Sequence, residues 1–251
     1  MSLQRKFFFV PDIGYKKTGF RQNDSPIACR VIEAAFTFQL NPRRPVKKIL
    51  KFATQMIRFV TYSAPGMAAC AVIAVFYAAY FLKMLHQRRK GITTDVMAKG
   101  DKPKALRRQE ALMKAATALV VPVELGSIFW NVHEVPLFLR AIGLAVAAAG
   151  TAVFIASMSA MRDSWRAGIP DKTSTALITD GIYRFSRNPA FLGFDLLYLG
   201  LLAAYPNAVH LGFAVFAILM LHKQILNEEA FLQRSFGEAY STYKSQVRRY
   251  L

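Results

Sequence analysis

The sequence predicts an all-α protein, a polytopic membrane helical bundle of about five transmembrane helices followed by amphipathic helices. Hydrophobic residues make up 54% of the 251 residues, yet the formal net charge is +18. Both values are expected if apolar blocks lie in lipid and basic blocks lie in the loops between them. A nucleic-acid-binding protein would also be basic, but it would not need uncharged runs of membrane length.

The apolar blocks differ in strength. The run at 59–82 carries no charge, and the run at 141–161 is rich in small side chains that allow close helix packing. The second block contains Pro122 and Glu124, and the last two are short, so we expect those two to be tilted helices packed on the others. The predicted spans are residues 59–82, 115–131, 141–161, 191–205 and 208–222.

The segment after these spans, residues 227–247, has the pattern of an amphipathic helix. Its apolar positions recur every three or four residues and therefore share one face. These positions are Leu232, Phe236, Tyr240, Tyr243 and Val247. Gly237 is expected to break this helix into two pieces.

Basic residues predict the orientation of the bundle. The segments 83–114 and 162–188 and the end of the chain are basic and lie on one side of the predicted spans, which should be cytoplasmic. The basic residues 1–58 would then lie on the other side, in conflict with the same rule. We therefore separate a basic segment at 1–55 from a membrane-embedded domain at 56–251, with its motif core at 162–251. A start at Met56 or Met67 would remove the conflict.

Cysteine and histidine spacing predicts neither a disulfide framework nor a metal site. Ionisable residues inside apolar spans are functional candidates, because they are expensive in lipid. Glu124 is one, with a structural pairing to an arginine or a backbone donor as the alternative. Asp195, within hydrogen-bonding reach of Tyr198, and His222 are others.

Two polar stretches carry the densest signal. In "DGIYRFSRNPAFLG", Asp180-Gly181 predicts a turn and Pro189 the first turn of a helix, beside Arg187. The positive end of that helix could bind an anionic group, and the alternative is anchoring of Arg184 and Arg187 at the membrane interface. In "NEEAFLQRSFGEAYSTY", one of the paired glutamates can face inward beside Arg187 and form a polar pocket.

Together the two stretches resemble the isoprenylcysteine carboxyl methyltransferase and phospholipid methyltransferase family of integral membrane enzymes. The first family block is matched by Leu177, Ile178, Thr179, Gly181, Ile182, Tyr183, Arg187, Asn188, Pro189, Phe191 and Gly193. The second is matched by Glu228, Glu229, Leu232, Phe236, Gly237, Tyr240 and Tyr243. Asn188 replaces the family's usual histidine, and an amide cannot act as a titrating base. The upstream "DSWRAGI" is similar to a bacterial branch of the family.

The resemblance implies methyl transfer from S-adenosylmethionine to a lipophilic acceptor, an isoprenylcysteine carboxylate or a phospholipid. It assigns catalytic roles to Arg187, Asn188 and Glu228. It assigns donor binding to Tyr183, Arg187, Asn188, Pro189, Gly193, Glu228, Glu229, Tyr240 and Tyr243. The site would lie at the cytoplasmic face of a bacterial inner membrane, with the bilayer as partner. Two alternatives stay open: a sterol-type membrane reductase using NADPH, and a membrane scaffold without activity.

Overall fold

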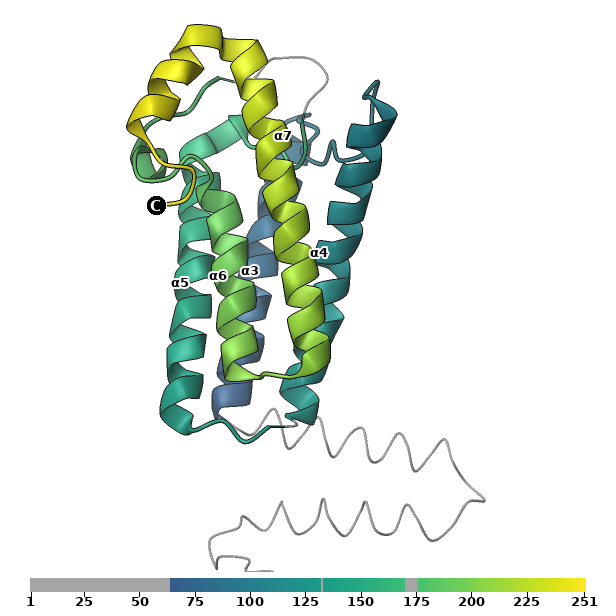
Figure 1. Ribbon diagram of the computed structural model, residues 1–251, viewed down its shortest axis with the longest axis vertical. Helices are drawn as coiled ribbons and strands as arrows, with labels where there is room; N and C mark the ends of the chain where they lie inside the picture. The colour runs from purple at the N-terminus through teal and green to yellow at the C-terminus, as the bar shows by residue number, and fades with distance from the viewer. Residues whose placement is uncertain (1–63, 132, 170–175) are drawn as a thin grey trace, which may run out of the picture. The chain divides into compact units, whose positions relative to one another are not determined.

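The computed structural model of the protein describes residues 64–131, 133–169 and 176–251, and in these ranges the chain is mostly helical. Long helices run alternately up and down, and short connections join α4 to α5 and α6 to α7 (Figure 1). The helices are α3 (Ala64–Arg89), α4 (Lys104–Trp130), α5 (Leu137–Met161), η1 (Arg162–Ser164), η2 (Gly181–Arg184), α6 (Pro189–Ala204) and α7 (Ala208–Gln246). The predicted all-α class is confirmed. Residues 1–55 lie outside the described residues.

The structure revises two element lengths. Four helices, α3, α4, α5 and α7, are long and apolar enough to cross a membrane, whereas α6 is a shorter apolar helix. The basic segment at 83–114 is mostly helix, since α3 continues to Arg89 and α4 begins at Lys104. Lys, Arg, Ala, Leu and Gln are all good helix formers, so both helices continue past their apolar stretches.

Glycines allow α5 and α6 to pack closely along their lengths (Figure 1). A Cβ atom added to Gly193 would lie 2.8 Å from the Gly150 carbonyl oxygen. One added to Gly200 would lie 2.6 Å from the Gly143 carbonyl oxygen. Small residues at such positions let helix backbones approach in lipid, where dispersion contacts drive association. This packing fixes the start of α6, and with it Arg187 and Asn188.

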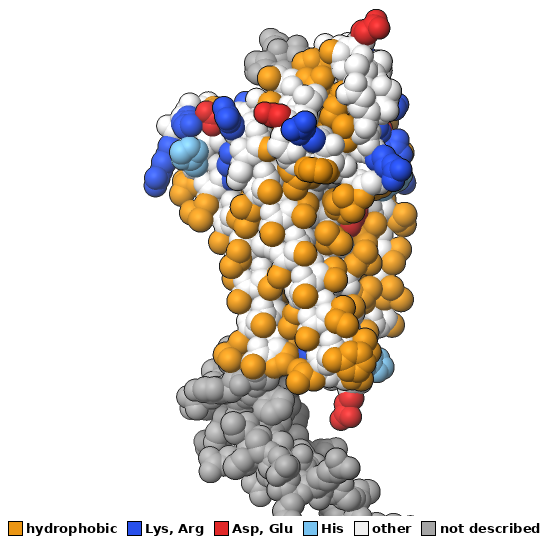
Figure 2. Space-filling view, turned by 90° about the vertical axis from the view of Figure 1, so that its left-hand side faces the viewer, with side chains coloured by type: hydrophobic (Ala, Val, Ile, Leu, Met, Phe, Trp, Pro, Cys, Tyr) orange, Lys and Arg blue, Asp and Glu red, His pale blue; other side chains and the backbone are white. Residues whose placement is uncertain are grey.

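The surface divides into two zones. On the face seen in Figure 2, hydrophobic side chains form a broad belt along the bundle, and Lys and Arg side chains gather above it at one end. Phe81 of α3, Leu119 of α4 and Leu219 of α7 are exposed hydrophobic side chains, which suit contact with lipid tails. The basic end is where α3 ends and α4 and α6 begin.

Three local predictions from the sequence are confirmed at this end. Gly181 has φ +59°, in the left-handed region that favours glycine. Pro189 is the first residue of α6, where its missing N–H costs nothing. Gly237 has non-helical angles (φ 53°, ψ −120°) and kinks α7, so the last part of that helix turns back over the start of α6 (Figure 1).

Candidate functional site

The two polar stretches, about forty residues apart in sequence, meet at the basic end of the bundle. An Arg187 guanidinium nitrogen lies 2.9 Å from Glu229 Oε1, and the Asn188 amide nitrogen donates to the same oxygen at 3.3 Å. A second guanidinium, from Arg249, binds Glu229 through two nitrogens at 3.0 and 2.9 Å. Glu229 is therefore the centre of a buried network that fixes Arg187 and Asn188.

The adjacent glutamates have different surroundings. Residues next to each other on a helix point about 100° apart. Glu229 points into the network with Arg187, whereas Glu228 lines a cavity inside the bundle. Glu228 accepts a hydrogen bond from the Gln224 side chain at 3.0 Å. Its carboxylate is thus the one placed to meet a ligand.

Tyr183 of η2 lines the cavity, and a residue of α7 binds the backbone of η2. The Tyr243 hydroxyl donates to the Tyr183 carbonyl oxygen at 2.7 Å, and the Tyr240 and Tyr243 rings lie 6.2 Å apart. Burial is the main cause that raises the pKa of the Tyr183 phenol, so this group stays protonated and can donate a hydrogen bond.

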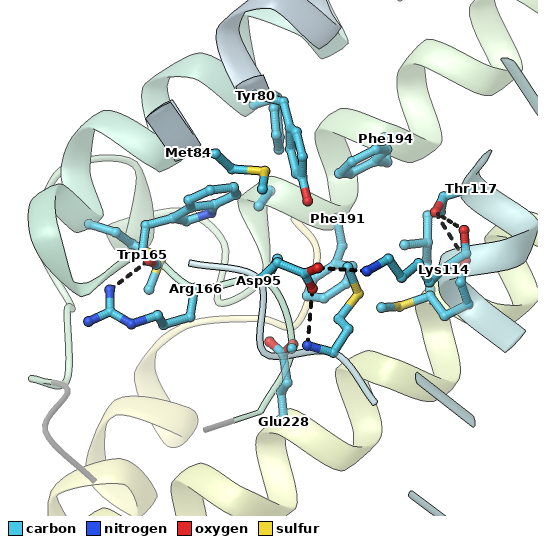
Figure 3. Close-up of a pocket in the computed structure, with 18 of the residues that line it drawn as sticks. Tyr80, Met84, Asp95, Lys114, Thr117, Trp165, Arg166, Phe191, Phe194 and Glu228 are labelled. Carbon is cyan, nitrogen blue, oxygen red and sulfur yellow. Dashed lines mark hydrogen bonds and ion pairs between the residues drawn. The ribbon is translucent and has the colours of Figure 1, made fainter. Parts of the chain in front are cut away.

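The cavity has a volume of about 820 Å³. Its polar end is formed by side chains from the α3–α4 connection, α4, the segment after η1, the start of α6, and α7. They are Asp95, Lys114, Arg166, Arg187, Asn188 and Glu228. Figure 3 shows Asp95 near the centre, between the aromatic side chains of Tyr80 and Phe194 and the carboxylate of Glu228.

The rest of the cavity is apolar and extends between the membrane helices. Ile73 of α3 and Val121 of α4 line this apolar part. Phe154 and Phe194 form one wall, with ring centroids 5.0 Å apart. Trp165 packs edge-on against Tyr80 at 5.5 Å. A cavity with one polar and one apolar end suits a pair of ligands of opposite character.

Two connections form a cover over the polar end. Residues 94–96 pair with Ala167 through backbone hydrogen bonds of 3.0 and 2.9 Å. Gln87, fully buried at the end of α3, fixes both connections: its amide donates to the Trp165 carbonyl at 3.1 Å, and its oxygen accepts from Thr94 at 2.7 Å.

A buried ion pair also holds this cover. Glu110 of α4 lies 2.7 Å from the Lys102 ammonium group, and the two side chains are 0% and 4% exposed. The same carboxylate accepts backbone N–H groups from Ala98 at 2.8 Å and Ile169 at 2.9 Å. Glu110 thus fixes both connections to the same helix.

Asp95 stays ionised at the cavity surface. Burial alone would raise the pKa of its carboxyl group, but hydrogen bonds from Lys114 and Lys99 more than offset this and hold the pKa below its usual value. The Lys114 nitrogen lies 2.6 Å away (Figure 3). The pair gives the polar end both an acceptor and a cation.

The predicted site residues therefore fall into two groups. Tyr183, Arg187, Asn188 and Glu228 line the cavity. The other predicted residues lie outside the cavity lining. Pro189 starts α6 and Gly193 packs on α5. Glu229 pairs with Arg187, and Tyr240 and Tyr243 are buried in α7.

The charged residues predicted within apolar spans have other surroundings. Both oxygens of Glu124 are buried and lack a hydrogen-bond partner within the described residues, so the expected arginine or backbone donor is not found there. The suggested hydrogen bond between Asp195 and Tyr198 is not found among the described residues, where Asp195 Oδ1 is buried without a partner. His222 Nδ1 lies 2.7 Å from the Tyr250 hydroxyl.

Sequence reasoning missed Gln87, Asp95, Lys102 and Glu110. A signal for one of them existed. Glu110 precedes Met113, Ala116, Val120 and Glu124 at helical spacing, and all five are buried on one face of α4. The other three lie in or beside the connection 90–103, and their partners are backbone groups or side chains brought together by the fold.

Comparison with known proteins finds similarity to methyltransferases. Residues 138–239 match the model of the family described as phospholipid methyltransferase. This match runs from α5 to the kink in α7 and includes Arg187, Asn188, Glu228 and Glu229. In this part, the chain is similar to that methyltransferase family.

A curated relative of the same group is the protein-S-isoprenylcysteine O-methyltransferase of Schizosaccharomyces pombe. It is 36% identical over 72 residues, which are 28% of this chain and 30% of that protein. The chain thus matches less than a third of this relative's length. The shared segment is similar to a methyltransferase, and helices α3 and α4 and the connection between them lie outside the family match.

Proposed function

We propose that the protein transfers a methyl group from S-adenosylmethionine to a lipophilic acceptor, at the cytoplasmic face of a bacterial inner membrane. One observation carries the proposal. Arg187 and Asn188 of the first family block and Glu228 of the second line the polar end of one cavity, whose other end is apolar and lies among the membrane helices.

The residues at the polar end fit the donor. Glu228 offers a carboxylate for hydroxyl or ammonium groups, and Tyr183 and Asn188 line the same end. Arg187 would bind a carboxylate of either donor or acceptor. When bound, S-adenosylmethionine supplies an electrophilic methyl group carried on a sulfonium centre. The volume of about 820 Å³ leaves room for part of an acceptor beside it.

The apolar end supports a lipophilic acceptor. Helices α3 and α4 make few contacts with each other, and both line the cavity. An acceptor could therefore enter between them from the bilayer, while the cover formed by residues 94–97 and 165–169 lies over the polar end. Exclusion of water by these side chains favours a transition state with dispersed charge, and alignment of the reactants supplies further acceleration.

Asn188 has a positioning role in this account. Its amide nitrogen is bonded to Glu229 and to the Arg249 carbonyl, at 3.3 and 3.2 Å. An amide cannot take up a proton, so Asn188 holds the network and does not serve as a general base.

The activity can be tested directly. Protein in lipid nanodiscs would be incubated with methyl-labelled S-adenosylmethionine and, in separate samples, N-acetyl-S-farnesylcysteine or dioleoylphosphatidylethanolamine. We expect label in the organic extract with one of these acceptors, which distinguishes a carboxylate from an amine. No label in either acceptor, or in the lipids extracted with the protein, would contradict the proposal.

Glu228→Gln should weaken S-adenosylmethionine binding at least about tenfold, or ~1.4 kcal/mol, because a charge-assisted hydrogen bond to the donor is lost. Titration calorimetry measures this affinity. Glu238→Gln is the matched control, since Glu238 lies exposed on the same helix. Equal affinities for the two variants would exclude Glu228 from the donor site.

A further inference from the structure

The five residues after α7 fold back against the start of α6, and we call residues 247–251 the strap. The Arg187 backbone N–H donates to the Arg248 carbonyl at 3.0 Å. The Arg249 carbonyl accepts from Ser186 Oγ at 3.3 Å and from the Asn188 amide at 3.2 Å. The strap thus contacts the three consecutive residues that lead into α6.

The side chain of Arg187, which lies just before α6, is held by α7 and the strap. One guanidinium nitrogen donates to the carbonyls of Val247 at 2.7 Å and Lys244 at 3.1 Å. The other binds Glu229 at 2.9 Å. The Arg187 side chain is 7% exposed, so its direction depends on these partners.

The Arg249 side chain completes this arrangement. Its guanidinium binds both oxygens of Glu229, a two-point geometry that also fixes the carboxylate plane. Without it, Glu229 would be a buried carboxylate with Arg187 as its only guanidinium partner among the described residues, and a buried charge that loses a partner is costly. Arg249 therefore controls the carboxylate that positions Arg187 and Asn188.

Tyr250 attaches the strap to His222 of α7. Its hydroxyl lies 2.7 Å from His222 Nδ1, and the two rings stack at 6.1 Å with an angle of 17° between their planes. The strap is thus attached to residues 186–188 by Arg248 and Arg249 and to α7 by Tyr250.

We propose that the strap positions the donor end of the cavity, with Arg249 as a positioning residue that acts through Glu229 on Arg187 and Asn188. Neither Arg249 nor Tyr250 lines the cavity. The inference rests on the proposed function, because the ligand that reports it is S-adenosylmethionine. Coupling between two sites is reciprocal, so a strap that favours donor binding must itself be held more firmly when the donor is bound.

Calorimetry with S-adenosylmethionine tests the first half. Arg249→Ala should weaken binding about fivefold or more, and Arg249→Lys should restore part of the affinity. Arg248→Ala is the matched control: it removes the same charge from the neighbouring residue, whose side chain is exposed and whose backbone carbonyl is kept. Wild-type affinity in Arg249→Ala, or an equal loss in Arg248→Ala, would overturn the proposal.

Hydrogen exchange on the unmodified protein tests the second half and does not depend on a variant folding. Saturating S-adenosylmethionine should slow exchange in the peptides that cover 184–190 and 247–251. A peptide from the middle of α5 should be unaffected. If wild-type protein binds S-adenosylmethionine and the strap is not protected, only this inference fails. If wild-type protein binds none, the proposed function fails.

Discussion

Glu110→Gln should lower the free energy of unfolding by about 3–5 kcal/mol, because it leaves the Lys102 ammonium group buried without its carboxylate. Lys102 is only 4% exposed, and its remaining acceptor is the Val96 carbonyl at 2.6 Å. The change also weakens the bonds from Ala98 and Ile169 that hold the cover over the cavity. Denaturant titration in mixed micelles measures the loss.

Two further variants make this prediction specific. Asp163→Asn removes a carboxylate from an ion pair with Lys90 in which both side chains are exposed. This substitution should leave the free energy of unfolding unchanged. Adding Lys102→Met to Glu110→Gln should recover at least about 1 kcal/mol, since no unpaired charge then remains buried. A Glu110→Gln variant as stable as Asp163→Asn would show that the buried pair contributes little.

Gly200→Ala should destabilise the bundle by about 1–3 kcal/mol, because the added methyl group has no room. Its Cβ would lie 2.5 Å from the Ala147 nitrogen and 2.6 Å from the Gly143 oxygen. Both are backbone atoms of α5, so the helices must separate. The thermal midpoint in detergent would fall accordingly.

The control lies on the next helix. A Cβ added to Gly212 of α7 meets no atom within 4 Å, so Gly212→Ala should keep the stability or raise it by up to about 1 kcal/mol through helix propensity. If Gly200→Ala were as stable as Gly212→Ala, α5 and α6 could not be as close as described.

Much of the fold follows from the sequence because apolar length and turn residues are local signals. Proline fixes its own φ at Pro189, and glycine permits the positive φ found at Gly181 and Gly237, so each of these signals is local to one residue. The extension of α4 back to Lys104 does not follow from apolar length, because its first turns are basic, although most of these residues favour helix.

The site was only partly predictable for a different reason. The sequence does not distinguish Glu228 from Glu229. The orientation of α7 places Glu228 at the cavity and pairs Glu229 with Arg187. Gly193 matches a family block, yet its neighbours are Gly150 and Phe154 of α5. The strap has no sequence pattern that predicts its position, since its contacts are made mainly by backbone carbonyls and by the pairing of Arg249 with Glu229.

The central claim is that S-adenosylmethionine binds at the polar end of the cavity. This end is lined by Tyr183, Arg187, Asn188 and Glu228. The most direct measurement is titration calorimetry of the purified wild-type protein with S-adenosylmethionine and, separately, with NADPH. We predict saturable binding of S-adenosylmethionine and no binding of NADPH. Binding of NADPH without binding of S-adenosylmethionine would contradict the account and favour a reductase.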